Sequence, residues 1–348
     1  MLGDRELLLR ENNVYTKQWN RININHQDKC KCDNNNCLFH AKFSYSKAYI
    51  EICDECNLSC PYCMIDSVPF PKGIQIPLAI VRYELCDLIH FLGVKQCWLS
   101  GGEPTLHTHF SEITWALSRI VGQLTIITNG ILLDQDNILE AISTSHSGCQ
   151  ISLPSVHNRE LIDLHGNIAN RILSNAMNLR SRLKDNRLIA HFILSRANTS
   201  FIADQIQFAK DYGYDEVIFT FVKPNGRAKE HPYLRLSLKD RVRILHQIKE
   251  LKNKYMINII LSGGLWDKQD NLPEAIVQKI QARACVDFSE EIEIRPDGAI
   301  IPCAKMHPRV RNSSGWPTIQ EYLQCMLNSC TFLSFPKSLI DCPIASRC

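Results

Sequence analysis

Three cysteines stand close together after a short apolar segment near the start of the chain. Cys56, Cys60 and Cys63 are separated by three and then by two residues, and the apolar residues 48–52 precede them. A run of this kind predicts a β-strand, so the cysteines would lie where a sheet presents side chains at its carboxyl edge. Three thiolates at that edge can hold an iron–sulfur cluster. Cys53 lies on or just beyond the strand, and we leave it out of the ligand set.

The cysteine content as a whole favours metal binding over disulfides. The chain has 16 cysteines in 348 residues, and most of them lie in groups. Disulfide frameworks belong mostly to small secreted domains, and the first residues contain no apolar signal core, so we expect a reducing cytoplasm. A second group near the start combines Cys30, Cys32, Cys37 and His40. These ligand types suit zinc or iron, and a metal-free loop is the alternative.

Composition and charge exclude little else. The chain is 45% hydrophobic and 22% charged, as is usual for a globular protein, and its length suggests one large and one small domain. The net charge of +3, from 39 basic and 36 acidic residues, does not indicate nucleic acid or a membrane surface as a partner. No apolar run reaches the ~18 residues that a membrane span needs.

Short apolar runs alternate with longer amphipathic stretches between residues 46 and 265. The strands that we predict are 48–52, 97–100, 124–128, 149–153, 188–194, 216–221 and 257–261. The helices that we predict between them are 78–91, 109–121, 138–144, 159–183, 201–212 and 238–255. Strands separated by helices of this length pair in parallel through right-handed crossovers. The sequence therefore predicts an α/β fold, a partial (β/α)6 TIM-like barrel with its chemistry at the carboxyl ends of the strands.

Unusual residues follow these strands at the predicted carboxyl edge. Gly101, Gly102 and Glu103 follow the second strand, Asn129 follows the third, and Ser152 lies at the end of the fourth. Glycines let a backbone approach a ligand closely, and a carboxylate can bind an ammonium group.

The pattern changes after residue 265. A hairpin is predicted at residues 292–301, where Pro296, Asp297 and Gly298 form a turn signal between alternating strands. The remaining tail is rich in cysteine and weakly patterned, so a metal cluster would stabilise it. We therefore predict three regions: a cysteine-containing extension (1–45), the barrel (46–265) and a small cysteine-rich domain (266–348).

The motif Cys56-x3-Cys60-x2-Cys63, with Tyr62 before its last cysteine and Gly101-Gly-Glu-Pro104 one strand later, resembles the radical S-adenosylmethionine (radical SAM) superfamily. The resemblance implies that the three cysteines bind a [4Fe–4S] cluster whose fourth iron chelates S-adenosylmethionine. It implies reductive cleavage of that molecule to a 5'-deoxyadenosyl radical, which abstracts a hydrogen atom from the substrate. Further contacts with S-adenosylmethionine are implied for Tyr62 at the adenine, Gly101, Gly102 and Glu103 at the methionine ammonium, Asn129 and Ser152 at the ribose or carboxylate, and Arg196 at the carboxylate.

The tail is similar to the twitch and SPASM extensions of the same superfamily, which carry auxiliary iron–sulfur clusters. The resemblance implies one auxiliary [4Fe–4S] cluster, with Cys285, Cys303, Cys342 and Cys348 as ligands and Cys330 in reserve. A zinc-bound tail is the alternative, because four thiolates suit zinc as well.

These resemblances imply a cytoplasmic radical SAM enzyme that modifies a peptide or protein side chain and takes electrons from a flavodoxin or ferredoxin. Dehydrogenation or rearrangement of a small molecule, of the sugar or aminocyclitol type, is the first alternative. A non-catalytic iron–sulfur or zinc scaffold is the second. The residues from Cys60 to Cys63 also match the dithiol of glutaredoxin-like proteins, but those domains need neither Cys56 nor the Gly-Gly-Glu-Pro edge. The residue that acts as hydrogen donor or base stays open.

Overall fold

The computed structural model describes residues 45–301, apart from 68, 70–72, 154, 157–167, 224–225 and 263–290. The metal ligands predicted in the amino-terminal extension, Cys30, Cys32, Cys37 and His40, lie outside the described residues. So do the predicted auxiliary ligands Cys285, Cys303, Cys342 and Cys348, and the reserve Cys330. The domain boundaries at residues 45 and 265 stay predictions.

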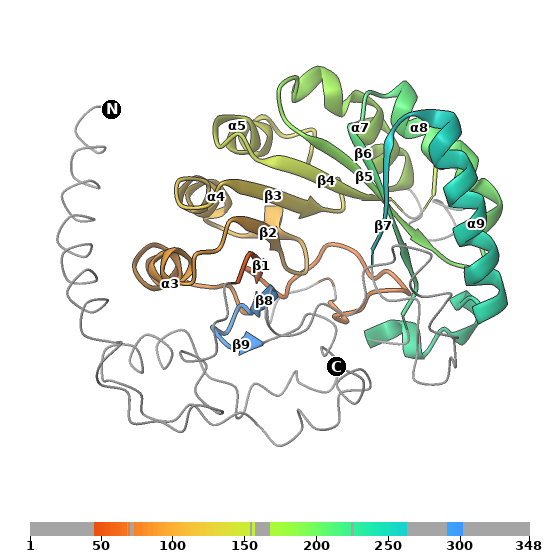
Figure 1. Cartoon of the computed structure of the whole chain (residues 1–348). Helices are drawn as coiled ribbons and strands as arrows, with labels where there is room; N and C mark the ends of the chain where they lie inside the picture. Colours follow the sequence, from red (N-terminus) through yellow and green to blue (C-terminus); the bar gives the residue numbers. More distant parts are fainter. Residues whose placement is uncertain are drawn as a thin grey trace, which may run out of the picture.

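A curved, mostly parallel sheet forms the centre of the molecule (Figure 1). Its order is β7-β6-β5-β4-β3-β2-β1-β8-β9, and every neighbouring pair is parallel except β8 with β9. The bounds are β1 Lys47–Glu51, β2 Gln96–Ser100, β3 Gln123–Thr128, β4 Gly148–Leu153, β5 Leu188–Leu194, β6 Glu216–Phe221, β7 Asn258–Ser262, β8 Glu291–Ile294 and β9 Ile300–Ile301. The predicted α/β partial barrel is therefore confirmed, with strand bounds that differ from the predicted ones by no more than one residue in β1 to β7.

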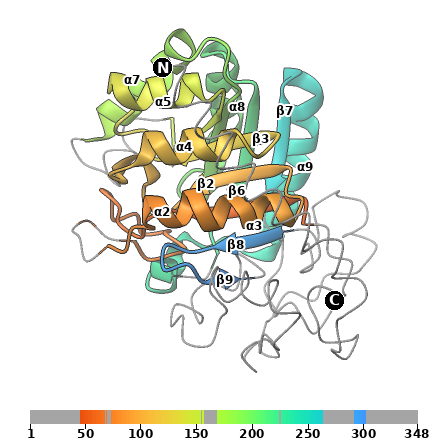
Figure 2. The same ribbon diagram turned by 90° about the vertical axis from the view of Figure 1, so that its left-hand side faces the viewer.

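Helices cover one face of this sheet, and the hydrophobic core lies between the two layers (Figures 1 and 2). On β5 and β6, Phe192 and Phe219 point into that core with ring centroids 5.8 Å apart. The main helices are α3 Cys86–Phe91, α4 Phe110–Ser118, α5 Asp136–Thr144, α7 Ala169–Arg182, α8 Ile202–Asp211 and α9 Leu238–Tyr255. Because strand side chains alternate between faces, His191 points to the face that the helices do not cover, where it contacts Ser152 and Thr220.

The helix predicted at residues 78–91 is interrupted by a wider turn. It consists of α2 (Leu78–Ile80), a π-helical segment η1 (Val81–Leu85) and α3. A π-turn inserts one extra residue into the helical repeat, and it still buries Val81 and Leu85. The sequence pattern gave no sign of this insertion.

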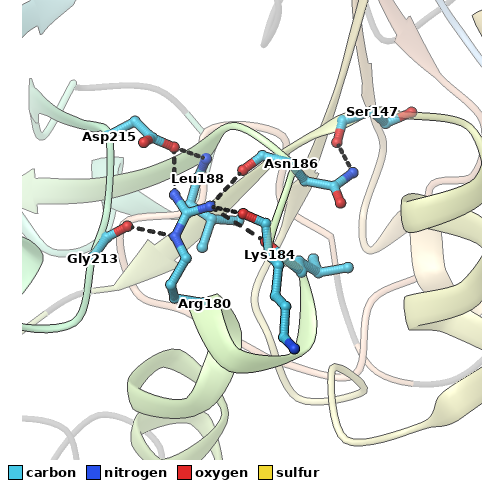
Figure 3. A network of polar contacts seen from close by, with 8 residues as sticks. Ser147, Arg180, Lys184, Asn186, Leu188, Gly213 and Asp215 are labelled. Atoms are coloured by element: carbon cyan, nitrogen blue, oxygen red, sulfur yellow. Dashed lines mark hydrogen bonds and ion pairs between the residues drawn. The ribbon is translucent and has the colours of Figure 1, made fainter.

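The amino ends of β5 and β6 are held by Arg180 at the end of α7 (Figure 3). Its guanidinium donates hydrogen bonds to the carbonyl oxygens of Gly213, Lys184 and Asn186 at 2.8 to 2.9 Å and forms an ion pair with Asp215 at 2.6 Å. The loops that lead into β5 and β6 are therefore tied together by one side chain. This arginine lies at the edge of the sheet opposite to the carboxyl ends of the strands.

The predicted hairpin at residues 292–301 is confirmed by the antiparallel pairing of β8 with β9. Gly298 has a φ of +81° in the turn, which a glycine adopts without strain. β8 pairs in parallel with β1, so this part of the predicted carboxyl-terminal domain extends the barrel sheet. None of the described helices combines the length and apolar character needed to cross a membrane.

Candidate active site

The three motif cysteines lie in the loop that follows β1, which we call the cysteine loop (residues 53–67). Cys56 is buried, Cys60 and Cys63 are partly exposed, and all three are free thiols. The amide of Cys63 donates to the carbonyl oxygen of Cys60 at 3.1 Å, which closes a turn between these two cysteines. The Leu58 amide lies 3.4 Å from Cys56 Sγ, where it can donate to the sulfur.

The cysteine loop lies directly on the glycines that follow β2. The Gly102 amide donates to the carbonyl oxygen of Cys53 at 2.7 Å, and the Glu103 amide donates to that of Glu55 at 2.8 Å. A Cβ atom on Gly101 would stand 2.4 Å from the Cys53 oxygen, and one on Gly102 would stand 2.0 Å from the Glu55 oxygen. Both glycines are thus required by the close approach of the two backbones, whatever ligand they also contact.

Cys53 is separated from the other three cysteines by its environment. It is fully buried, and its thiol lies 3.3 Å from the carbonyl oxygen of Glu103, to which it can donate. Burial raises the pKa of Cys53 to about 12, as it does for Cys56 and Cys60, so the thiol pKa does not distinguish it from them. The contact with the Glu103 oxygen is that of a packing residue, and the exclusion of Cys53 from the ligand set stays a prediction.

Glu103 is a buried carboxylate that is surrounded by neutral hydrogen-bond donors. One oxygen accepts from the Thr105 hydroxyl at 2.6 Å and from the Thr128 hydroxyl at 2.7 Å, and the other accepts from the Asn129 amide at 2.7 Å. Burial raises the pKa of Glu103, and the donated hydrogen bonds oppose that shift. Among the described residues no lysine or arginine pairs with it. The carboxylate is held rigidly and can accept a cationic ligand.

Asn129, at the end of β3, joins Glu103 to the cysteine loop. Its side-chain amide donates to Asn57 Oδ1 at 2.7 Å and lies 3.9 Å from Cys56 Sγ. Residues that follow β1, β2 and β3 thus contact one another at the carboxyl edge, where parallel pairing places the ends of these strands. Sequence reasoning placed Asn129 at this edge, and its contact with the cysteine loop was not foreseen.

Ser152 lies farther along the edge, in a polar group on the face of the sheet that the helices do not cover. Its hydroxyl is 3.4 Å from His191 Nδ1 on β5, and His191 Nε2 is 2.9 Å from the Thr220 hydroxyl on β6. Burial lowers the pKa of His191 to about 4, so the imidazole is neutral near pH 7. The sequence reasoning missed His191, although a histidine within an otherwise apolar strand was a visible signal.

Two other predicted contacts differ in position, because Tyr62 lies in the cysteine loop beside Cys60 whereas Arg196 stands apart from it. Tyr62 lies between Cys60 and Cys63 in the cysteine loop, and burial raises its pKa well above the usual value. Arg196 lies two residues beyond β5 with an exposed side chain, and its amide donates to the carbonyl oxygen of Leu234 at 3.1 Å. The described contacts do not bring Arg196 to Glu103 or to the cysteines. The roles predicted for these site residues stay predictions.

A second arginine lies where the sequence placed it, in the Gly226-Arg227 pair that follows the predicted strand 216–221, but the sequence reasoning gave it no role. Arg227, just beyond β6, donates to the carbonyl oxygens of Cys60 at 2.7 Å and Ser67 at 2.6 Å. Its own amide donates to the Cys63 oxygen at 3.0 Å. The visible signal was a Gly-Arg pair at the carboxyl end of a predicted strand.

The three cysteines fit the thiolate ligands of an iron–sulfur cluster, and Glu103 beside them fits an ammonium group. Burial raises the pKa of Cys56 and of Cys60 to about 12, and the charge of Arg227 opposes this for Cys60. A metal would displace these protons, since thiolates are the binding form. No three His, Cys, Asp or Glu side chains of the described residues are grouped to hold a single metal ion. In a cluster each thiolate binds a different iron, so such a grouping is not required.

Comparisons with known proteins match part of the chain to a family model and to two proteins of known activity. Residues 50–195 match the family model described as "Radical SAM superfamily". The chain is 28% identical over 195 residues to GTP 3',8-cyclase of Synechocystis, covering 53% of this chain and 56% of that protein. It is 24% identical over 264 residues to the antilisterial bacteriocin subtilosin biosynthesis protein AlbA of Bacillus subtilis, covering 74% of this chain and 54% of that protein. The chain thus spans little more than half the length of these two relatives.

A solved structure with the same fold is SuiB of Streptococcus suis. The crystal structure bound to S-adenosylmethionine is 17% identical, with a TM-score of 0.60, and the likeness covers 75% of this chain and 60% of that one. The structure bound to precursor peptide SuiA gives a TM-score of 0.61 at 16% identity, covering 78% and 61%. At these identities the likeness concerns the fold alone.

Proposed function

We propose that this chain, whose residues 50–195 match the radical SAM superfamily model, is an enzyme that cleaves S-adenosylmethionine reductively and modifies a peptide or protein side chain. The observation that carries the first part is the pairing of three free thiols with Glu103, a buried carboxylate 1% exposed. Thiols alone suit many metals. A rigid carboxylate beside them adds a place for the ammonium of a bound amino acid.

The residues of the chain have distinct tasks in this proposal. Cys56, Cys60 and Cys63 would hold three irons of a [4Fe–4S] cluster. Glu103, fixed by donors from Thr105, Thr128 and Asn129, would accept the methionine ammonium of S-adenosylmethionine. When bound, this pair of cofactors supplies an electron and an adenosyl-derived radical that removes a hydrogen atom from the substrate. Three thiolates would leave the fourth iron of the cluster open to S-adenosylmethionine, whose ammonium group Glu103 would bind.

Reductive cleavage can be tested directly. Anaerobically reconstituted protein is incubated with S-adenosylmethionine and dithionite, and 5'-deoxyadenosine is measured by mass spectrometry. We expect product from the wild type and none from Cys60→Ala. Cys86→Ala is the matched control, because Cys86 is a buried cysteine on α3. Absence of product from a wild-type protein shown to contain the cluster would exclude the enzyme proposal.

A peptide substrate is the finer part of the proposal. The alignment with the bacteriocin biosynthesis protein covers 74% of this chain, against 53% for the cyclase, and so extends farther along it. The test uses peptides encoded by short reading frames beside the gene, and it looks for a change in peptide mass together with 5'-deoxyadenosine. The similarity to GTP 3',8-cyclase supports a small molecule as the second candidate. Consumption of GTP with unchanged peptides would favour that candidate.

The proposal includes an auxiliary cluster at Cys285, Cys303, Cys342 and Cys348, and an electron donor such as a flavodoxin or ferredoxin. Its support is the resemblance of the tail sequence to twitch extensions. Changing Cys303 and Cys342 together to Ala should lower the iron content by about half and leave Cys56, Cys60 and Cys63 loaded. Loss of zinc with an unchanged iron content in this variant would favour the zinc-bound tail.

A further inference from the structure

We propose that Arg227, with Gly226, is a positioning residue that fixes the shape of the cysteine loop from the far side of the barrel. The inference rests on the proposed function in one respect only, namely that this loop binds a cluster. The fixing of the loop itself follows from contacts between described residues. Its test therefore includes a measurement on the protein without cluster.

The position of Arg227 makes its contacts unusual. β6 and β1 are separated in the sheet by β2, β3, β4 and β5, so their neighbouring loops are not brought together by strand pairing. In Figure 1 the orange segment after β1 runs across to the side of the sheet that carries β6 and β7. There it meets the short helical segment η5 (Gly226–Lys229), which begins with the Gly-Arg pair. The two loops close the open side of the carboxyl edge.

Three hydrogen bonds from one residue span the cysteine loop. The Arg227 guanidinium donates to the oxygens of Cys60 and Ser67 at 2.7 and 2.6 Å, and the backbone amide donates to Cys63 at 3.0 Å. Cys60 and Cys63 are two of the three proposed cluster ligands. A planar guanidinium fits two separated carbonyl oxygens at once, which a lysine ammonium on a flexible stem does less well.

Gly226 allows this contact because it has no side chain. A Cβ atom there would stand 2.4 Å from the Cys63 oxygen and 2.5 Å from the Met64 oxygen. Its φ of +53° is also one that other residues adopt only with strain. Both observations mean that the backbone before Arg227 presses against the backbone of the cysteine loop.

An ordinary surface ion pair is the other explanation for Arg227. Its guanidinium lies 3.3 Å from Asp66 Oδ1, but the Asp66 side chain is 55% exposed, and exposed pairs contribute little. The Arg227 side chain is only 13% exposed. Shorter hydrogen bonds to two partly buried carbonyl oxygens therefore account for its placement better than the ion pair does.

The first measurement is amide hydrogen exchange of the protein without cluster, over peptides that cover residues 56–67. We expect Arg227→Ala to speed exchange there by about tenfold or more, because two hydrogen bonds to the loop are lost. Arg227→Lys should fall between Arg227→Ala and the wild type. Asp66→Asn removes the ion pair and keeps the carbonyl bonds, so it should exchange like the wild type.

The matched control is Arg180→Lys, which removes the same kind of arginine clamp at the opposite edge of the sheet (Figure 3). It should speed exchange near residues 183–187 and leave residues 56–67 unchanged. Wild-type exchange of the cysteine loop in Arg227→Ala and Arg227→Lys would overturn the proposal. An Asp66→Asn effect as large as that of Arg227→Ala would also overturn it, in favour of the ion pair.

The second measurement is the rate at which a chelator removes iron from the reconstituted protein. We expect faster loss from both Arg227 variants and a wild-type rate in Arg180→Lys. Equal rates in all variants would contradict the role of Arg227 at the cluster. If the wild type binds no cluster, the proposed function fails, while the exchange experiment still decides whether Arg227 fixes the loop.

Discussion

Replacing Gly102 by alanine is the sharpest test of how the cysteine loop is supported. The added Cβ would lie 2.0 Å from the Glu55 oxygen, 2.4 Å from the Glu55 carbonyl carbon and 2.7 Å from the Asp54 oxygen. All three are backbone atoms, so no side-chain rotation can relieve the overlap. The segment from Asp54 to Glu55 must move away from the loop after β2.

The cost of that movement follows from the hydrogen bonds that it breaks. The bonds from the Gly102 amide to Cys53 and from the Glu103 amide to Glu55, 2.7 and 2.8 Å long, are the ones at risk. Each contributes about 1 kcal/mol, and a buried amide left without a partner costs about 1 to 3 kcal/mol. We expect the free energy of unfolding to fall by about 3 kcal/mol and the iron content after reconstitution to fall as well.

Two glycines serve as controls because each isolates another effect. A Cβ on Gly93 meets no atom within 4 Å, but its φ of +69° makes Gly93→Ala cost about 1 kcal/mol through backbone strain alone. Gly122→Ala, whose nearest atom is 3.4 Å away, should be nearly neutral. Unfolding in urea is followed by circular dichroism, and iron is measured per chain. The reasoning is refuted if Gly102→Ala is no less stable than Gly93→Ala and binds as much iron as the wild type.

Three further outcomes are expected. Glu103→Gln should weaken binding of S-adenosylmethionine about tenfold or more in anaerobic equilibrium dialysis, because a charge-assisted bond is lost, with iron content retained; unchanged affinity would contradict the ammonium site. Between pH 6.5 and about 4 His191 is protonated in the unfolded chain and neutral in the folded one, because burial lowers its pKa to about 4. The contribution of His191 to the free energy of unfolding should therefore be complete above pH 6.5 and fall by about 3 kcal/mol toward pH 4. Urea unfolding measured at several pH values should show a smaller loss in His191→Gln. Ser237→Ala should cost about 1 kcal/mol in urea unfolding, because the Ser237 hydroxyl accepts from the Asp240 amide at the start of α9, whereas the exposed Ser181→Ala should cost less.

The strands were predictable because their residues carry a local signal. β5 and β6 were predicted with the bounds that the structure has, since runs such as residues 188–194 are apolar apart from His191 and include β-branched and aromatic residues. Parallel order followed from the helices between strands, and with it the meeting of Cys56, Glu103 and Asn129 at one edge. These residues come from successive strands, so sheet order alone brings them together.

The contacts that were missed depend on pairs far apart in sequence. Arg227 reaches Cys60 across 167 residues, and nothing near either residue specifies the other. The glycines after β2 were predicted to contact a ligand, which stays a prediction, but their close approach to the cysteine loop was not foreseen. The π-turn at Val81–Leu85 was missed for another reason, because one extra residue in a helix hardly changes its apolar pattern.

The reach of Arg227 also fixes an order of events during synthesis. Cys60 leaves the ribosome 167 residues before Arg227, which at ~5–20 residues per second is a delay of roughly ten to thirty seconds. β8, which completes the backbone pairing of β1, is made later still. Throughout this interval the cysteine loop lacks the hydrogen bonds that Arg227 donates to it. Machinery that delivers iron and sulfide would therefore meet the finally shaped loop only after the segment that carries Arg227 has been made.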